Sequence, residues 1–257
     1  MPESDLDLLL RAAKEAGEIA LSHFGADPKI WEKDDNAGPV TEADLSVNAH
    51  LQSALTSARP DFGWLSEETE DGSERLAKDK LFIVDPIDGT RAFIDRSENW
   101  AHSLAIVENG TPTAGVVEMP QKGLTFWATK GGGAFLNGKP IKVAPVDRIK
   151  DATVLTAKPN LRPEFWIGGK APPFNTSFRS SLAYRLCAVA SGRFDAMITL
   201  RPTWEWDVAA GTLIVEEAGG QAFDQTGSAL IYNNPQPKLS GVLAGGPVVP
   251  KLVSQLV

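Results

Sequence analysis

The sequence of 257 residues is poor in several features that mark common classes of protein. It contains one cysteine, Cys187, so no disulfide can form within the chain, and a reducing compartment is expected. Lysine and arginine number 25 against 33 aspartates and glutamates, and the net charge of −8 argues against a nucleic-acid polymer as partner. An anionic small molecule is still compatible with this charge if metal ions reverse the local sign.

Long hydrophobic runs are missing as well. No stretch approaches ~18 uninterrupted apolar residues, so the sequence predicts no membrane span. Residues 1–17 have neither a basic n-region nor a continuous apolar h-region, so we expect no signal peptide and a cytoplasmic location. Histidines are scarce: His23 and His50 fall on predicted helices and His102 lies beside a predicted strand. We expect all of them, and Cys187, to be structural.

The chain does contain enough apolar sequence for a sizeable core, because hydrophobic residues make up 42% of it. Apolar periodicity predicts a helix over 4–24, with Ser4 and Asp7 as a capping pair. A second helix is expected to begin at Thr41 and to end before Pro60.

The order of the expected elements predicts an α/β protein with an α+β first half. Asn-Gly pairs at 109–110 and 137–138 predict hairpins, and strands and helices alternate from about residue 150. No flexible linker is visible, so we expect two tightly packed domains, 1–141 and 142–257. The second half is expected to hold strands over 152–157 and 194–200 and helices over 180–192 and 206–220.

An acidic turn follows an apolar strand in LFIVDPIDGTRAF, residues 81–93. The strand is expected over Leu81 to Val84, directly before the turn. Asp85 and Asp88, three residues apart in a tight turn, can point at one place, and the carbonyl of Ile87 can point there too. Hard oxygen ligands of this kind are what Mg²⁺ prefers.

The same turn is suited to bind an anion. Gly89 has no Cβ to block an approaching group, and the amides of Gly89 and Thr90 are expected to open a short helix. Six residues would thus hold a divalent metal and a phosphate together. An ordinary Asp-Pro and Asp-Gly turn is the structural alternative, and this segment alone favours neither.

Other acidic residues are candidates with structural explanations of their own. Glu67 opens an acidic run, and such runs usually form solvated surfaces. Asp44 stands three residues after Thr41, the N3 position of a capping box. Asp207 precedes a predicted helix, where the helix dipole favours a negative charge.

Together these segments resemble the inositol monophosphatase superfamily. The similar motifs are TEAD at 41–44, SEE at 66–68, DPIDGTRAF at 85–93 and WDVAAGTLIVEEAGG at 206–220, in the family's order and across nearly the whole chain. The hairpin GGGAFLNGKPI at 131–141 is also similar. The resemblance implies a layered αβαβα sandwich and a Mg²⁺-dependent, lithium-sensitive phosphomonoesterase acting on a small phosphorylated metabolite. It also allows for a homodimer.

The resemblance implies a set of metal ligands for two or three Mg²⁺ ions. Glu67, Asp85 and the carbonyl of Ile87 would hold the first ion. Asp85, Asp88 and Asp207 would hold the second, so that Asp85 bridges the two. Two metals roughly 4 Å apart can bind the attacking and leaving oxygens of an in-line displacement, which agrees with the chemistry of phosphate monoesters.

The resemblance also implies the groups around the reacting phosphate. Glu67 and Thr90 would orient the attacking water, and Asp44 would form a hydrogen bond with Thr90. Lys33 would supply a supporting charge, and the phosphate would lie at the amides of Gly89 and Thr90, as the turn itself indicates.

The choice of substrate is carried by fewer residues. Leu200 stands seven residues before Asp207, where inositol-specific members of the superfamily carry a glutamate that binds sugar hydroxyls. The segments at 180–192 and 201–211 resemble more closely the bacterial 3′(2′),5′-bisphosphate nucleotidases, although Ala183 replaces a lysine and Arg201 a glycine of their pattern.

Adenosine 3′,5′-bisphosphate, hydrolysed to AMP, is therefore the first expected substrate, inositol 1-phosphate the second and histidinol phosphate the third. Arg179 could add charge for a second phosphate, and the other expected substrate contacts are Ser180, Ser181, Arg185 and Trp204. A metal-binding scaffold without turnover is the alternative from another functional class, and the intact set of acids argues against it.

Overall fold

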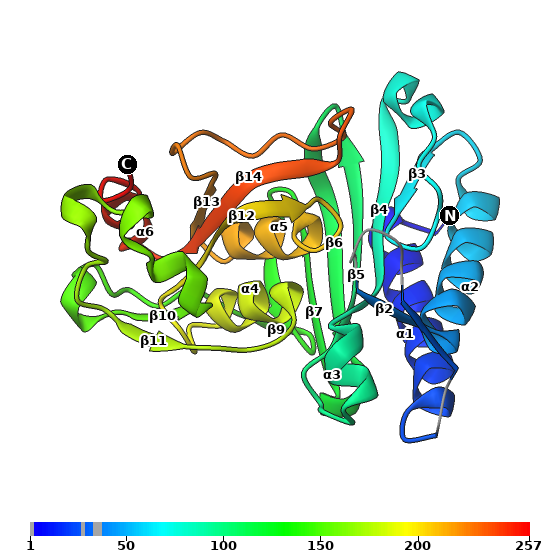
Figure 1. The fold of residues 1–257 in the computed structure, drawn as a ribbon. Helices are drawn as coiled ribbons and strands as arrows, with labels where there is room; N and C mark the ends of the chain where they lie inside the picture. The colour runs from blue at the N-terminus through cyan, green and yellow to red at the C-terminus, as the bar shows by residue number, and fades with distance from the viewer. Residues whose placement is uncertain (1–2, 27–28, 33–37) are drawn as a thin grey trace.

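Helices and sheets alternate in layers in the computed structural model, which describes residues 3–26, 29–32 and 38–257 (Figure 1). The expected residue Lys33 lies outside the described residues. Within them, the larger sheet has seven strands, in sequence order: β3 (Gly63–Ser66), β4 (Lys80–Asp88), β5 (Ala101–Glu108), β6 (Thr111–Met119), β7 (Leu124–Thr129), β8 (Gly133–Leu136) and β9 (Lys139–Pro140). Only β3 and β4 run parallel; the other pairs are antiparallel.

Two long helices cover one face of this sheet, α1 (Asp5–His23) and α2 (Glu42–Ala58) (Figure 1). Their apolar residues form one core with alternate residues of the sheet such as Phe82 and Val84. Leu81 and Ile83, on the opposite face, pack instead toward α4 (Leu182–Ala190) and α5 (Ala209–Glu217). The strand β4 is therefore apolar on both faces because helices cover both.

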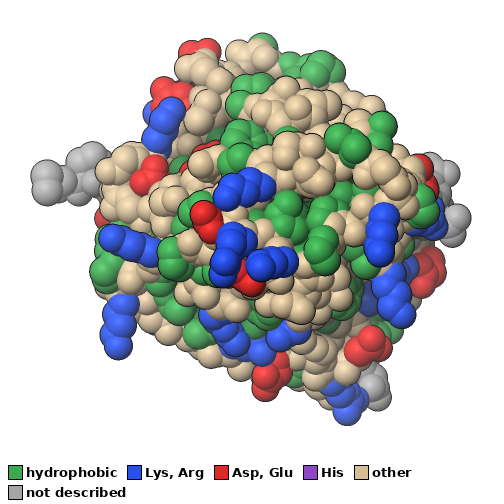
Figure 2. Space-filling model, turned by 90° about the vertical axis from the view of Figure 1, so that its left-hand side faces the viewer, with side chains coloured by type: hydrophobic (Ala, Val, Ile, Leu, Met, Phe, Trp, Pro, Cys, Tyr) green, Lys and Arg blue, Asp and Glu red, His purple; other side chains and the backbone are tan. Residues whose placement is uncertain are grey.

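A second sheet lies beyond α4 and α5. In the described part of the chain it has five strands, in the order β11-β10-β12-β14-β13: β11 (Asn175–Ser177), β10 (Thr153–Thr156), β12 (Ala196–Trp204), β14 (Lys238–Gly245) and β13 (Gln221–Phe223). Its outer face carries α6 (Val249–Val253) and a third core. Figure 2 shows the molecule from this side, with Lys and Arg side chains near the middle of the face.

This order of layers confirms the expected αβαβα sandwich. The two sheets use residues 63–140 and 153–245, but α4 and α5 pack against both of them. The division into 1–141 and 142–257 stays a prediction.

The remaining elements are short. They are the paired strands β1 (Ile30–Glu32) and β2 (Pro39–Thr41), the helix α3 (Thr90–Ile94), and the 3₁₀ helices η2 (Ser73–Ala77), η3 (Pro120–Lys122), η4 (Ile149–Asp151), η5 (Lys158–Leu161), η6 (Pro163–Phe165) and η7 (Ile167–Gly169).

The local signals read from the sequence are confirmed where they are strongest. Ser4 caps α1 by accepting from the amide of Asp7, and Thr41 and Asp44 form the capping box of α2. Asn109 takes a positive φ of 49°, as the hairpin turn between β5 and β6 requires. None of the helices in the described ranges is long and apolar enough to cross a membrane.

Candidate active site

A bulge in β4 sets the geometry of the acidic turn. Asp85 pairs with Ser103 of β5, but Asp88 pairs with Ala101, so β4 has one more residue than its partner between these two positions. In a regular strand, residues three apart face opposite sides of the sheet. The extra residue of a bulge turns Asp88 back to the side of Asp85. The expectation that the strand ends before Asp85 was wrong, because the strand continues through the bulge.

Three carboxylates gather at this end of the sheet. Asp85, Asp88 and Asp207, the last from the turn between β12 and α5, each offer an oxygen within 4.8 Å of the others. Asp85 is 1% exposed, and no hydrogen-bond donor reaches either of its buried carboxylate oxygens in the part of the chain that the structure describes. Buried charges without partners are costly, so this arrangement fits a site for cations.

Burial and mutual repulsion govern the ionisation of the cluster. Burial, followed by the charge of Glu67, raises the pKa of Asp85 well above its usual value. Burial and the charge of Asp88 do the same for the pKa of Asp207. Burial raises the pKa of Asp88 from 3.8 to about 6, opposed by hydrogen bonds. A bound cation would relieve this cost by holding the carboxylates ionised.

The start of α4 fixes Asp88. The hydroxyl of Ser181 donates to Asp88 Oδ2 at 2.6 Å, and the amide of Ala183 donates to the same oxygen at 2.6 Å. Ser181 also caps α4 by accepting from the amide of Tyr184. The buried Ser181 therefore orients Asp88, leaving Asp88 Oδ1 for the cluster.

Thr90 and Asp44 form a second buried pair. Thr90 Oγ1 lies 3.1 Å from Asp44 Oδ1 and 3.2 Å from the carbonyl oxygen of Ile87. Asp44 Oδ2 accepts from the amide of Thr41 at 2.8 Å and from its hydroxyl at 2.6 Å. Burial raises the pKa of Asp44, and the hydrogen bonds from Thr41 and Thr90 oppose it. Since both partners of the Thr90 hydroxyl accept, it donates to one of them and keeps its own lone pairs for a further donor.

The turn is also supported from beneath. His102 on β5, fully buried, donates from Nδ1 to the carbonyl oxygen of Pro86 inside the bulge. Burial lowers the pKa of His102 to about 4, so the ring is neutral near pH 7. Gly89 has a φ of 102°, and a Cβ there would lie 3.2 Å from the carbonyl oxygen of Asn99. A residue other than glycine would strain this end of the turn.

The cluster opens into a cavity of about 420 Å³. The cavity collects the expected metal and phosphate residues of the described chain: Glu67, Asp85, Ile87, Asp88, Gly89, Thr90 and Asp207. Of the expected substrate contacts, Ser180 and Trp204 line it. Ser181 and Arg185 do not line it. Arg185 is 6% exposed, with its Nε donating to the carbonyl oxygen of Arg179 at 2.5 Å.

Trp204 cannot offer a free ring face in this conformation. Its ring stacks on Trp206 with centroids 4.5 Å apart and an interplanar angle of 13°. The ammonium of Lys238 lies 3.8 Å from the centroid of the Trp204 ring. Since Trp206 covers one face of that ring, Lys238 lies over the other face. Trp204 therefore presents its edge to the cavity.

Other cavity residues had no role in the sequence analysis. Arg91, Arg201 and Phe178 line the cavity, whereas Leu200 is 5% exposed and packs in the outer core. These two neighbouring residues lie at a second bulge, between Thr199 and Pro202 of β12, where Leu200 packs in the core and Arg201 lines the cavity. The sequence signal for Arg201 was its position in place of a glycine.

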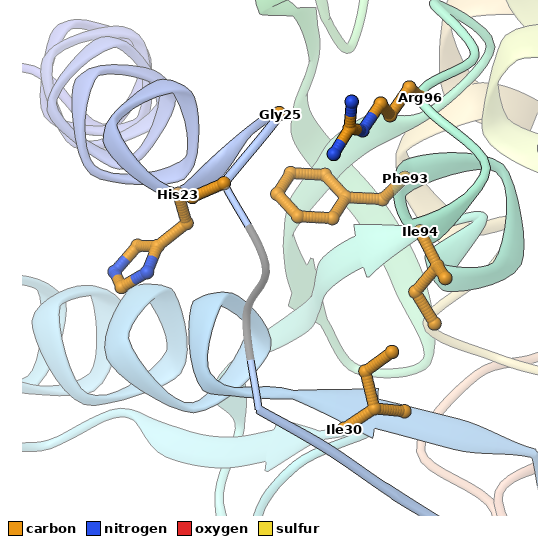
Figure 3. A pocket seen from close by; sticks show the side chains of 7 residues that line it. His23, Gly25, Ile30, Phe93, Ile94 and Arg96 are labelled. Atoms are coloured by element: carbon orange, nitrogen blue, oxygen red, sulfur yellow. The ribbon is translucent and has the colours of Figure 1, made fainter.

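A smaller cavity of about 160 Å³ lies elsewhere (Figure 3). His23, Phe93 and Arg96 are among its lining residues, and it shares none with the acidic cavity. No carboxylate side chain of the described residues lines it, so it has no ligands for a hard cation.

Comparison with known proteins decides the family. The profile of the inositol monophosphatase family matches residues 1–251. The chain belongs to the inositol monophosphatase family. Members of this family are Mg²⁺-dependent hydrolases of phosphoric monoesters, which act on small phosphorylated substrates. The expectations of a phosphatase and of Mg²⁺ are confirmed.

Relatives of similar identity carry different names. The chain is 35% identical over 236 residues to inositol monophosphatase 3 of Solanum lycopersicum, covering 88% of each chain. It is 34% identical over 257 residues to a histidinol-phosphatase of Mycobacterium tuberculosis, covering 95% of this chain and 96% of the other. It is 32% identical over 239 residues to the 3′(2′),5′-bisphosphate nucleotidase CysQ of Aggregatibacter actinomycetemcomitans, covering 88% and 86%. Identity alone does not select the substrate.

Solved structures agree on the fold. An inositol monophosphatase of Thermotoga maritima superposes with a TM-score of 0.82 at 30% identity, covering 97% of this chain and 95% of the other. The layered sandwich of this chain is therefore a fold already known in the family.

Proposed function

We propose that this family member hydrolyses a phosphate monoester whose leaving group carries a ring and a second anionic group, with adenosine 3′,5′-bisphosphate as substrate and AMP as product. The observation that carries the proposal is the lining of the metal cavity by Arg91 and Arg201 beside the aromatic side chain of Phe178. Neither arginine side chain has an ion pair among the described residues. Cations without partners favour an anionic ligand over a neutral or cationic one.

The acidic cluster fits the family's Mg²⁺ ions. Both oxygens of Asp85 are buried without donors, and carboxylates are the ligands that this ion prefers. We propose Glu67, Asp85, Asp88, Asp207 and the carbonyl of Ile87 as the ligands of two or three ions. When bound, Mg²⁺ would neutralise phosphoryl oxygens and acidify a bound water.

The chain's own residues would orient the attacking water. With its hydrogen donated to Asp44 or to Ile87, the hydroxyl of Thr90 can accept a hydrogen bond from a water molecule in the cavity, and that hydrogen stays on the water. Glu67 lines the same cavity and would accept the hydrogen bond of the other water hydrogen and take this one proton as the water attacks. The backbone amides of Gly89 and Thr90 would hold the phosphate. An in-line displacement then requires the leaving group to lie opposite the water, and we assign Ser180, Phe178 and Arg201 to that side.

The alternative substrates fit this lining less well. A polyol needs acceptors for its hydroxyl groups, and the expected position for such an acceptor, Leu200, is apolar and packed in the core. Histidinol phosphate carries an amine that is cationic near pH 7, which Arg91 and Arg201 would disfavour.

A panel of substrates tests the proposal. Release of free phosphate from adenosine 3′,5′-bisphosphate, inositol 1-phosphate and histidinol phosphate is measured at equal Mg²⁺ and salt. We expect the highest kcat/KM for the bisphosphate, and a loss of about tenfold or more for this substrate in Arg201→Ala. Highest kcat/KM for inositol 1-phosphate would replace the proposal with the second candidate, and absence of phosphate release from every substrate would favour a scaffold.

Cellular location and assembly are further parts of the proposal. We propose a cytoplasmic location, which the single, buried and free Cys187 supports. We also propose a homodimer, which sedimentation of the purified protein at several concentrations tests.

A further inference from the structure

A second cavity adjoins the active-site cavity. It measures about 470 Å³ and lies at the ends of β10 and β11, on the side of the second sheet. Phe178 lines both cavities and therefore forms the wall between them. A ligand that crosses Phe178 could occupy both cavities at once.

Phe178 is held as a platform. The guanidinium of Arg185 lies 4.5 Å from its ring centroid and covers one face. Arg185 itself is fixed, since its Nε donates to the carbonyl oxygen of Arg179. Phe178 is nevertheless 55% exposed. The face away from Arg185 is thus available to a planar group.

The residues that line the second cavity include hydrogen-bond donors without a described partner. Lys158, at the start of η5, is exposed and has no ion pair with any described residue. Thr176 and Ser177 line the same cavity, and their hydroxyls have no hydrogen-bond partner within the described residues. The ammonium of Lys158 and a hydroxyl of β11 at one cavity, beside the apolar Leu161, suit an anionic group such as a phosphate.

Another cavity beside the acidic cluster is lined by negatively charged side chains. It measures about 400 Å³ and is lined by the carboxylates Glu67 and Asp71 with Trp206 and two prolines. No Lys or Arg of the described chain lines it, and an anion would meet like charges there. Of the two flanking cavities, only the one with Lys158 suits a second anionic group.

We propose that the cavity formed by Lys158, Thr176, Ser177 and Phe178 is a subsite for the second, uncleaved phosphate of the substrate, and that the ring between the two phosphates lies across Phe178. The subsite rests on the proposed nucleotide substrate, because a leaving group without a second anion would not need it. With this subsite, substrate specificity would depend on residues of η5 and β11, two elements that carry none of the proposed metal ligands.

The test compares two nucleotides that differ in this phosphate. Lys158→Met keeps the length of the side chain and removes the charge, and Lys14→Met, at an exposed position of α1 without a described ion pair, is the matched control. Adenosine 3′,5′-bisphosphate has the second phosphate, and adenosine 3′-monophosphate lacks it. We expect Lys158→Met to lower kcat/KM for the bisphosphate by about 10- to 100-fold and for the monophosphate by less than about twofold. Lys14→Met should change neither.

Binding of AMP provides a measurement that does not depend on turnover. AMP retains the uncleaved phosphate, so calorimetric titration should show a Kd raised about tenfold or more in Lys158→Met. Such a change would support the subsite even if inositol 1-phosphate were the best substrate, in which case only the proposed function would fail. Equal losses for both nucleotides, or unchanged AMP binding in Lys158→Met, would overturn the subsite while leaving the nucleotide substrate in place.

Discussion

Without bound metal, the wild-type protein should be less stable than its inactive variant Asp85→Asn, because the carboxylates of the acidic cluster repel one another. Asp85 faces Asp88 and Asp207 at ligand-atom separations within 4.8 Å, and no donor reaches its oxygens within the described chain. Asp85→Asn keeps the shape of the side chain and removes its charge. We expect the variant to unfold at a higher temperature than the wild type when Mg²⁺ is chelated, and to have almost no phosphatase activity when Mg²⁺ is present.

The size of the effect follows from the repulsion. Two charges at this distance repel by about 3 kcal/mol at an effective dielectric constant of about 20. Burial is the main cause that raises the pKa of Asp88 from 3.8 to about 6, so desolvation at this site adds a cost of the same order for an ionised carboxylate, since one pKa unit is about 1.4 kcal/mol. Because the asparagine amide would itself lack a partner, we expect a net gain of about 2 kcal/mol, or roughly 4–8 °C in Tm for a chain of this size.

The order of the two proteins should reverse with metal. Mg²⁺ at ~100 times its Kd stabilises the wild type by about 2.7 kcal/mol but should hardly affect the variant. Calorimetric melting at pH 7.5 measures the Tm difference between Asp85→Asn and the wild type, once with chelator and once with Mg²⁺. Asp61→Asn at an exposed position is the control. The pKa of Asp85 is raised in the folded protein, so its carboxyl group favours the fold at low pH and loses this effect as pH rises. The Tm difference between Asp85→Asn and the wild type in chelator should therefore disappear near pH 4. A lower Tm for the variant in chelator, or an undiminished Mg²⁺ shift, would refute the reasoning.

Other predictions concern groups that act through their neighbours. Thr90→Ala should lower kcat by about 10²- to 10⁴-fold while Mg²⁺ affinity, measured by calorimetric titration, stays near wild type, because the hydroxyl orients water and does not bind metal. Ser181→Ala should cost about 1 kcal/mol in unfolding free energy through the lost cap and weaken Mg²⁺ binding about tenfold or more through Asp88; unchanged Mg²⁺ affinity would contradict that role. His102, with its pKa lowered from 6.5 to about 4, should make the fold lose about 3 kcal/mol as pH falls through this window, and His102→Gln should show a shallower loss by urea unfolding at pH 7 and pH 4.5.

The sequence predicted best what lies within short segments. The capping pairs of α1 and α2 depend on residues three apart, and both were identified. The acidic turn could be interpreted as a metal site because Asp85 and Asp88 are near in sequence. The family resemblance then supplied Asp207, more than a hundred residues away, which no local pattern connects to the turn.

What the sequence could not predict depends on partner strands. The bulges of β4 and β12 exist because β5 and β14 have one residue fewer at the same points. Within a single strand nothing marks them, so the first of these strands was expected to end at Val84, and Arg201 was noted only as the replacement of a glycine. Likewise Ser181 was expected to bind substrate, whereas the packing of α4 brings its hydroxyl to Asp88.

Asp44 shows that a structural and a functional explanation of one residue need not compete. A carboxylate has two oxygens, and here they are divided: Oδ2 accepts from Thr41 and closes the capping box, and Oδ1 accepts from Thr90 at the cavity. The cap holds the carboxylate in one rotamer, and that rotamer presents Oδ1 to the Thr90 hydroxyl as an acceptor beside the carbonyl oxygen of Ile87. An acceptor of the Thr90 hydroxyl at the cavity is therefore positioned by the first turn of α2. A sequence pattern that is fully explained by helix capping is thus no argument against a role in the active site.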